Sequence, residues 1–366
     1  TPGDNFDVFG DMNAAALKTK RNRVKKGGNL ILNSDCFDYK KLRLSKYDDG
    51  VNPLEDGSLG DYEVYKIPVT KLTRECLKES PLGMKEKDRC KNMFVLGFLL
   101  WRYNRSLEDT INFLSSKFKA KPNLSTLKAG YHLGETTETF TTTYEVKSAP
   151  MEKGVYRSIM GNQALVLGLV TASQKSGLPL FYGSYPITPA SDILHGLSHH
   201  KNFGVKTFQA EDEIAAVCAA IGAAYGGNLA VTGTSGPGIA LKGEAIGLAG
   251  ILEIPLVICN IQRGGPSTGL PTKTEQSDLM QALYSRNGES PLPVIAAKSP
   301  SDCFEVALEA CRIAIQHMTP IILLSDGYIA NGAEPWRFPK AADIPAIKVN
   351  FSNPQENGAT EFLPYE

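Results

Sequence analysis

Four short segments carry side chains that could bind and activate an anionic substrate, and each follows an apolar run. The first is Tyr185-Pro186-Ile187-Thr188-Pro189, in which Thr188 stands where a helix N-cap is expected and Pro189 at the first helical position. Free backbone N–H groups at such a helix start attract anions. Thr188 could therefore cap the helix, help to bind a carboxylate, or do both.

The second segment places three carboxylates, Glu211, Asp212 and Glu213, at the start of a helix. The helix dipole stabilises acidic residues there, which is a sufficient structural explanation. The helix that follows is apolar or small on every face, however, so we expect it to pack against a neighbour. A carboxylate at its start would be partly desolvated, which raises its pKa. The pattern fits both a structural and a functional role.

The third and fourth segments also follow predicted strands. Residues 232–238 (Thr-Gly-Thr-Ser-Gly-Pro-Gly), with Ser235 and Gly236 at their centre, are dense in glycine, which allows a close approach of the backbone to a ligand. They lack the Lys-Ser/Thr ending of a Walker A loop. Arg263, followed by two glycines, could present its guanidinium group to a carboxylate, or pair with an acid on the surface.

Alternating apolar strands and helices from residue 161 onward position these four segments. Strands are predicted at 178–182, 206–208, 229–231, 256–261, 294–297 and 321–324, and helices at 162–176, 213–225, 239–249 and 301–317. This alternation predicts an α/β fold with an open, mostly parallel sheet that has helices on both faces. Ligands bind at the carboxyl ends of such strands, so we expect the four segments to converge at one edge.

The first 135 residues form a separate region. Strands are predicted at 29–32 and 63–67, a buried helix at 92–104 and a capped helix at 106–119. No catalytic constellation occurs in this α/β region, which favours a scaffold or docking domain. Its opening residues resemble the middle of a domain, so we expect it to be incomplete at its N-terminus.

Two segments have the composition of linkers. Residues 136–160 are predicted to be a linker. The polar, Thr-rich stretch from Glu135 to Lys153 has no helical period and could be an extended linker or an edge strand. Residues 161–340 then form the domain with the four segments. The Pro- and Asn-containing tail, 341–366, is predicted to be a linker toward a C-terminal domain absent from this chain.

The composition argues against several functions. Lys plus Arg equals Asp plus Glu at 39 each, which leaves no basic field for nucleic acid or a membrane surface. No apolar run approaches the roughly 18 residues of a membrane span and no signal region opens the chain, which indicates a cytoplasmic protein. The 7 cysteines include no C-x-x-C pair, so we expect no metal or iron–sulfur site on this chain.

Taken together, residues 185–192, 209–216, 234–238 and 262–269 resemble the α subunits of 2-oxoacid:ferredoxin oxidoreductases, most closely the 2-oxoglutarate type. The resemblance is strong over 161–339. Residues 1–135 resemble the γ domain that some of these enzymes carry ahead of the α domain. The resemblance implies a thiamin diphosphate-binding fold in which this chain supplies the pyrimidine-binding domain.

The resemblance further implies roles in binding the cofactor. A buried carboxylate hydrogen-bonded to the aminopyrimidine ring activates thiamin diphosphate for attack on a 2-oxo group. Glu213 is expected to be that carboxylate, with Glu211 as the alternative. Ser235 and Gly236 are expected to line the cofactor cavity.

The substrate carboxylate is, by the same resemblance, expected to bind to Thr188 and Arg263. Tyr185, Pro186 and Ile187 are expected to shape the pocket around it. Neither group distinguishes 2-oxoglutarate from pyruvate or a branched-chain 2-oxoacid, because all of these share the carboxylate. A non-catalytic nucleotide-binding or scaffold subunit is the alternative of a different class.

The resemblance implies that this chain holds only half of an active site. The diphosphate half uses a Gly-Asp-Gly motif, which this sequence lacks, and Ser325-Asp326-Gly327 is predicted to be a strand end. A β subunit is therefore expected to bring Mg2+, the diphosphate site and a [4Fe-4S] cluster, in an α2β2-type assembly. The complex would pass electrons to ferredoxin and the acyl group to coenzyme A.

Overall fold

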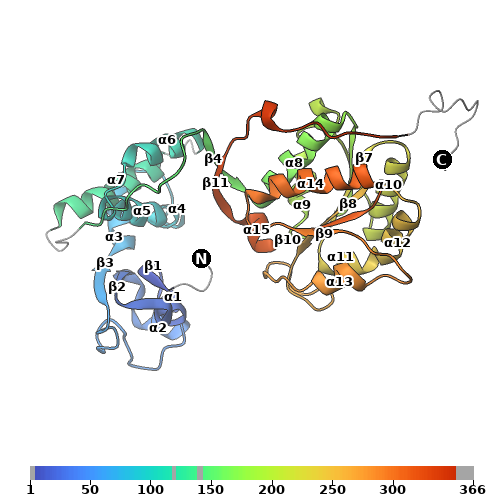
Figure 1. Cartoon of the computed structure of the whole chain (residues 1–366). Helices are drawn as coiled ribbons and strands as arrows, with labels where there is room; N and C mark the ends of the chain where they lie inside the picture. The colour runs from blue at the N-terminus through green and yellow to red at the C-terminus, as the bar shows by residue number, and fades with distance from the viewer. Residues whose placement is uncertain (1–4, 118–120, 138–142, 352–366) are drawn as a thin grey trace, which may run out of the picture. The chain divides into compact units, whose positions relative to one another are not determined.

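The computed structural model describes residues 5–117, 121–137 and 143–351, and the chain divides into two compact units at residues 151 and 152 (Figure 1). That division lies inside the linker predicted at 136–160, of which residues 138–142 lie outside the described residues. We call the part up to residue 151 unit 1 and the part from residue 152 unit 2. Each unit has its own hydrophobic core.

Unit 1 has a parallel sheet of three strands in the order β1-β2-β3. The strands are β1 (Phe6–Asp11), β2 (Val24–Asn33) and β3 (Glu63–Ile67). The helices are α1 (Ala14–Lys20), α2 (Tyr39–Leu44), α3 (Val69–Cys76), α4 (Met84–Arg89), α5 (Lys91–Arg102), α6 (Leu107–Lys117) and α7 (Lys121–Thr136). The strand predicted at 63–67 and the helices predicted at 92–104 and 106–119 are thus present, although 118 and 119 lie outside the described residues.

Two glycines set the distance between α5 and α7. A Cβ added to Gly97 would lie 1.9 Å from the carbonyl oxygen of Leu127, and one added to Gly130 would lie 1.8 Å from that of Phe94. Any larger residue would therefore force the two helices apart. This close pair covers the sheet on the side where Ile31, Phe94 and Phe98 are buried together.

Unit 2 has a parallel sheet of six strands in the order β6-β5-β7-β8-β10-β9, which confirms the predicted parallel sheet. The strands are β5 (Leu180–Ser184), β6 (Lys206–Gln209), β7 (Leu229–Thr234), β8 (Leu256–Gln262), β9 (Val294–Ala296) and β10 (Ile321–Asp326). The helices are α8 (Gly161–Ser176), α9 (Ser191–Ser198), α10 (Glu213–Tyr225), α11 (Gly236–Leu241), α12 (Gly243–Ile251), α13 (Leu279–Tyr284), α14 (Asp302–His317) and α15 (Gly327–Asn331).

Helices cover both faces of this sheet (Figure 1). Val257, Cys259 and Ile261 of β8 pack with α8 and α14, whereas Leu256 and Ile258 pack with α10, α11 and α12. Successive residues of a strand point to opposite faces, so this division shows that β8 is buried on both sides. The prediction of a sheet covered on both faces is confirmed.

Two ends of unit 2 differ from the predicted linkers. Residues 156–160, predicted to be linker, form β4 (Tyr156–Met160), which pairs antiparallel with β11 (Ala333–Arg337). Beyond it, Ile344 and Ile347 pack on the core, and the N–H of Ile347 donates a hydrogen bond to the carbonyl of Lys175 (3.0 Å). The prediction of a linker is therefore wrong for 341–351, because apolar side chains hold this segment on the domain; 352–366 lie outside the described residues.

Candidate active site at the carboxyl edge of the six-stranded sheet

The first three segments meet at Gly238. Tyr185 directly follows β5, and its hydroxyl is hydrogen-bonded to that of Thr234 at the end of β7 (2.8 Å). A Cβ added to Gly238 would lie 2.1 Å from each of these two oxygens and 3.0 Å from the Cγ of Glu213. Only glycine allows α11 to start so close to these side chains. The structure therefore brings Tyr185, Glu213 and Thr234 together.

Glu213 is the first residue of α10 and is half-buried. The N-cap is Asp212, whose carboxylate accepts the N–H of Ala215 (2.8 Å), so Glu213 is not needed for capping. Burial, with the nearby Glu213 carboxylate adding to it, raises the pKa of the Tyr185 hydroxyl. Glu211, in contrast, is exposed. Of the two predicted carboxylates, the geometry favours Glu213.

The predicted helix start after Thr188 is wrong. The bond between Thr188 and Pro189 is cis, and α9 begins only at Ser191 with Ala190 as N-cap. The reason is Ser191, whose Oγ accepts the N–H of Ile187 (2.9 Å) and donates to its carbonyl (3.0 Å). These bonds close a turn ahead of the helix, so neither Thr188 nor Pro189 starts it.

The first segment instead presents an exposed Thr188 beside a buried arginine. Pro186 is also exposed, whereas Tyr185 and Ile187 are buried. The carbonyl oxygen of Thr188 accepts a hydrogen bond from Arg263, as described next. An anion site at this point would therefore depend on Arg263 rather than on a helix N-terminus.

Arg263 follows β8 and is buried, so it is not the paired surface arginine that was the alternative. Its Nη1 donates to the carbonyl of Thr188 (2.7 Å) and its Nη2 to the carbonyl of Thr268 (2.7 Å). Its Nε is buried without a hydrogen-bond partner among the described residues. Because both acceptors are neutral, the positive charge is held in place without being neutralised, which suits a carboxylate ligand.

Ser235 and Gly236 lie where β7 passes into α11. Ser235 Oγ is buried without a partner among the described residues. A Cβ added to Gly236 would lie 3.2 Å from the carboxylate of Asp278. This carboxylate in turn accepts a hydrogen bond from the Nδ2 of Asn260 in β8 (3.0 Å). The absence of a side chain at Gly236 therefore leaves room for the buried carboxylate of Asp278.

Four buried polar atoms at this edge lack a partner in the described part of the chain: Ser235 Oγ, Asn260 Oδ1, Arg263 Nε and Ser325 Oγ. Each such atom costs roughly 1–3 kcal/mol when it stays unsatisfied. Their concentration at the ends of β7, β8 and β10 is typical of a site that a polar ligand completes. The residues present thus fit a polar cofactor or substrate.

Sequence reasoning missed Lys242, Asn260 and Asp278. Lys242 is completely buried between α11 and α12, where one continuous helix was predicted at 239–249. Asn260 interrupts the apolar strand β8, and Asp278 lies in the segment that follows Arg263. A polar residue inside an apolar run was the available signal for the first two, whereas nothing local marks Asp278.

The segment Ser325-Asp326-Gly327 is a strand end, as predicted. Asp326 closes β10 and caps α15 by accepting the N–H groups of Tyr328 (2.7 Å) and Ile329 (3.3 Å). Its second oxygen accepts a hydrogen bond from Gln276 (2.6 Å). Both carboxylate oxygens of Asp326 therefore have structural partners.

The described residues contain no cluster of three or more His, Cys, Asp and Glu side chains arranged to bind a metal. None of the helices described is both long and apolar enough to cross a membrane.

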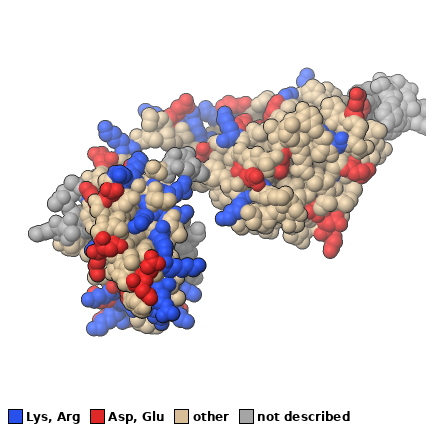
Figure 2. All heavy atoms as spheres, turned by 90° about the horizontal axis from the view of Figure 1, so that it is seen from below, with Lys and Arg blue, Asp and Glu red and all other residues tan. Residues whose placement is uncertain are grey.

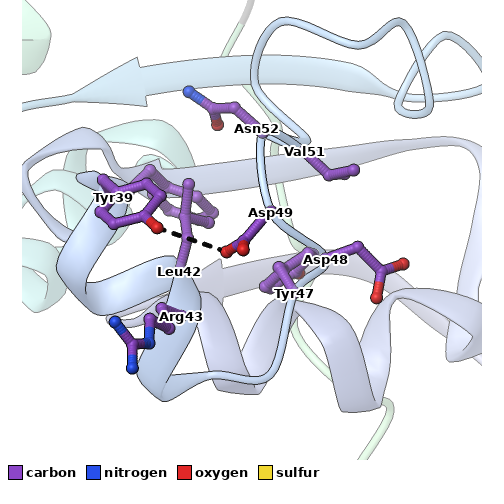
Figure 3. Close-up of a pocket in the computed structure, with 10 residues that line it drawn as sticks. Tyr39, Leu42, Arg43, Tyr47, Asp48, Asp49, Val51 and Asn52 are labelled. Atoms are coloured by element: carbon purple, nitrogen blue, oxygen red, sulfur yellow. Dashed lines mark hydrogen bonds between the residues drawn. The ribbon is translucent and has the colours of Figure 1, made fainter.

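Unit 1 contains a separate depression of about 180 Å3 beside α2 (Figure 3). Figure 3 shows Tyr39 and Asp49 facing each other across it, and the Tyr39 hydroxyl donates to Asp49 (3.4 Å). Arg43 and Asp48 add charges of opposite sign to its wall. None of the residues in the four segments lies in unit 1, so we assign no part of the candidate site to this depression.

Comparisons with known proteins connect both units to one group of enzymes. Residues 173–365 match the family described as "Pyruvate flavodoxin/ferredoxin oxidoreductase, thiamine diP-bdg". Residues 1–133 match the family described as "Pyruvate ferredoxin/flavodoxin oxidoreductase". These two matches come from separate parts of the chain and agree.

Individual relatives agree with these families. The 2-oxoglutarate oxidoreductase subunit KorA of Mycobacterium tuberculosis is 56% identical over 370 residues, covering 100% of this chain and 56% of that protein. The 2-oxoglutarate synthase subunit KorA of Archaeoglobus fulgidus is 41% identical over 196 residues, 53% of this chain and 55% of that protein. The chain thus spans about half the length of these relatives.

A solved structure matches as well. It is the 2-oxoglutarate:ferredoxin oxidoreductase from Magnetococcus marinus with 2-oxoglutarate, coenzyme A and succinyl-CoA bound. The TM-score is 0.80 at 31% sequence identity, over 97% of this chain and 58% of that chain. The agreement covers both the fold and the sequence.

Proposed function

Because the chain belongs to the pyruvate flavodoxin/ferredoxin oxidoreductase family, we propose that it is part of the α subunit of a 2-oxoglutarate:ferredoxin oxidoreductase. This enzyme would convert 2-oxoglutarate and coenzyme A to succinyl-CoA and CO2, and pass two electrons to ferredoxin. The names of the Mycobacterium tuberculosis relative and the Magnetococcus marinus structure support 2-oxoglutarate as the substrate.

One observation carries the proposal: side chains from all four segments converge at the carboxyl edge of one parallel sheet. Tyr185, Glu213 and Thr234 meet at Gly238, and Arg263 holds the carbonyl of Thr188, three residues after Tyr185. The Glu213 carboxylate and the Arg263 guanidinium group thus both lie beside the segment from Tyr185 to Thr188. A proton-transfer group and an anion-binding group in such proximity suit a 2-oxoacid beside a cofactor.

Thiamin diphosphate, when bound, supplies the carbon nucleophile and electron sink that decarboxylation of a 2-oxoacid requires. In this chain, Glu213 and Tyr185 would bind its aminopyrimidine end, and Ser235 and Gly236 would line the cavity. Glu213 would share a proton between a carboxylate oxygen and a ring nitrogen. Its half-buried position limits competition from water for that hydrogen bond.

The substrate carboxylate would bind to Arg263 and Thr188. Arg263 has a free Nε and is already oriented by two carbonyl groups, so little side-chain entropy is lost on binding. The exposed Thr188 hydroxyl would add a neutral hydrogen bond. Pro186 and Ile187 would form the adjacent wall of the pocket together with Tyr185.

Exposed apolar side chains on unit 2 support a partner subunit. Ile214 follows Glu213 and is 52% exposed, and Ile251 at the end of α12 is 79% exposed. α13 adds the exposed side chains Leu279, Met280 and Tyr284. Figure 2 shows that uncharged side chains dominate the visible face of unit 2, whereas charges of both signs cover that of unit 1. Large exposed apolar areas are typical of subunit interfaces.

We infer that the partner is a β subunit that brings the diphosphate half of the site, Mg2+ and a [4Fe-4S] cluster, in an α2β2-type cytoplasmic assembly. This sequence lacks the Gly-Asp-Gly motif that the diphosphate half of such a site uses. Unit 1 would be the γ-type domain of the subunit, and unit 2 its pyrimidine-binding domain.

A pyruvate or branched-chain specificity is the second candidate, since the matching family is named for pyruvate. The full-length subunit would be assembled with its β partner, thiamin diphosphate, Mg2+ and coenzyme A, and a low-potential dye would report turnover of each 2-oxoacid. We expect kcat/KM for 2-oxoglutarate to exceed that for pyruvate by on the order of 10²-fold or more. A preference for pyruvate would support the second candidate, and no turnover of any 2-oxoacid would support a scaffold subunit.

A further inference from the structure

Lys242 is a buried charged residue beside the candidate site, and it has no role in the reaction proposed above. It lies between α11 and α12 and has no exposed surface. Its Nζ donates hydrogen bonds to the carbonyl oxygen of Glu213 (2.7 Å) and to the Oγ1 of Thr232 (3.2 Å). The same atom lies 5.2 Å from the centre of the Tyr185 ring. Lys242 thus contacts three of the elements that form the site.

These contacts do not explain Lys242 as a stabilising residue. Both hydrogen-bond acceptors are neutral, and burying an ammonium group without a paired carboxylate is strongly unfavourable for folding. A methionine could fill a similar volume at this position without that cost. A lysine in such a place is more often explained by function than by stability.

We propose that Lys242 is a positioning residue of the thiamin diphosphate site, which acts through Glu213 in two ways. Its bond to the Glu213 carbonyl fixes the first turn of α10, from which the carboxylate projects. Its positive charge also attracts the Glu213 carboxylate and so helps to hold that carboxylate toward the cofactor. This inference rests on the proposed function.

The pH dependence gives this role a distinct signature. Burial lowers the pKa of Lys242 to about 8, and Glu213, Cys218 and Asp212 of α10 oppose that shift. Tyr185 from the first segment and Thr232 from β7 are the other groups that face it. As the pH rises through about 8, Lys242 loses its charge, and the attraction between Lys242 and the Glu213 carboxylate is lost. We therefore expect activity to decline there.

Two substitutions in the assembled complex test this role. Lys242→Met removes the charge and keeps the length of the side chain, and we expect kcat to fall on the order of 10²-fold. The affinity for thiamin diphosphate, measured by calorimetry between about pH 6 and pH 10, should lose its dependence on pH near the pKa of Lys242, which is about 8. Thr232→Val keeps the charge but removes one acceptor, so the alkaline decline should move to lower pH.

Two further variants serve as controls. Lys206→Met removes an exposed lysine at the start of β6 and should change neither kcat nor the pH profile. Lys242→Arg keeps a positive charge at every accessible pH, so a complex that assembles should no longer show the alkaline decline.

An unchanged pH profile in both Lys242→Met and Thr232→Val would overturn the inference. If Lys242→Met fails to assemble, as gel filtration would show, the profile of Thr232→Val decides alone. The proposed function fails separately: it is contradicted if Glu213→Gln keeps normal turnover. An inactive Glu213→Gln together with unchanged pH profiles in Lys242→Met and Thr232→Val would refute only the role of Lys242.

Discussion

The two parallel sheets of this protein differ in what happens to polar groups at their carboxyl edges. In unit 1, Asn33 ends β2 and is satisfied by its surroundings: its Nδ2 donates to Thr70 Oγ1 (3.0 Å) and to Cys36 Sγ (3.2 Å). In unit 2, Ser235 Oγ, Asn260 Oδ1 and Arg263 Nε have no partner among the described residues. The sheet edges are similar in topology, but only the second has several groups available to a ligand.

The comparison teaches that the fold alone does not define a site. Both edges arise from parallel strands, and both bury polar residues. Residues far apart in the sequence face each other in both units: Asn29 and Arg102 of unit 1 are 73 positions apart, and Thr188 and Arg263 of unit 2 are 75 apart. What distinguishes unit 2 is that several buried polar atoms at its strand ends have no partner among the described residues. Unit 1 has two such residues among those described, since Asp11 Oδ2 at the end of β1 and Thr73 Oγ1 in α3 are buried without a partner.

The largest effect is expected for Glu213→Gln in the assembled complex. Glutamine keeps the shape of the side chain but cannot exchange a proton, so kcat should fall by on the order of 10²–10⁴-fold. Steady-state kinetics measures this loss, and gel filtration with the β subunit shows whether assembly is intact. Normal turnover in this variant would remove Glu213 from the mechanism and make the edge of unit 2 as inert as that of unit 1.

Asp11→Asn tests whether the unpartnered carboxylate of Asp11 in unit 1 affects stability without taking part in catalysis. Burial raises the pKa of Asp11 from 3.8 to about 6, although the backbone N–H groups of Asn13 and Met12 oppose the shift. Burial therefore favours the protonated form of Asp11 in the folded state. The stability that this form contributes is fully present below pH 3.8 and is lost as the pH rises through about 6. That loss is roughly 3 kcal/mol, and asparagine, which stays neutral, should abolish it.

Urea unfolding at several pH values measures this effect. The chain has 2 tryptophans, Trp101 in unit 1 and Trp336 in unit 2, so a Trp336→Phe background reports unit 1 alone. Turnover of the assembled complex should not change in Asp11→Asn. An equal pH dependence in both proteins would contradict the assignment, and a loss of turnover would give unit 1 a part in the chemistry.

Arg263→Ala should weaken substrate binding. A hydrogen bond to a charged group contributes about 1.5–3 kcal/mol, so KM for the 2-oxoacid should rise about 10- to 150-fold. The matched control is Arg312→Ala, which removes an exposed arginine paired with Glu309 on α14 and should leave KM unchanged. An unchanged KM in Arg263→Ala would exclude Arg263 from the substrate site.

The smallest effect is expected for Glu211→Gln. Glu211 is exposed, and its carboxylate lies outside the group that meets at Gly238. We expect kcat to change less than about 2-fold, since surface substitutions away from a site have small effects. Parallel kinetics of Glu211→Gln and Glu213→Gln decide between the two carboxylates, and a larger loss in Glu211→Gln would reverse their roles.

The sequence predicted the frame of unit 2 well, because strands buried on both faces are continuous apolar runs that local composition reveals. β8 was predicted at 256–261 and extends over Leu256–Gln262, and α10 has the predicted bounds. The prediction failed where a side chain redirects the backbone. Ser191 closes a turn that moves the start of α9, and apolar contacts of Ile344 and Ile347 hold a segment that looked like a linker.

The candidate site could be predicted only in part. Motifs identified Tyr185, Glu213 and Arg263, since these lie in short segments with a recognisable spacing. Asp278 carries no such signal, because its role depends on a contact with Asn260 in a strand 18 positions earlier. Residues that act through tertiary contacts are visible only once the fold is known.

The central claim is that this chain forms half of a thiamin diphosphate site. The most direct test is a titration of thiamin diphosphate and Mg2+ into the full-length subunit alone, into its β partner alone and into the assembled complex, followed by calorimetry. We predict tight binding only to the complex, with weaker binding when Glu213→Gln is present. Equally tight binding to the subunit alone, or to the complex regardless of Glu213, would contradict the account.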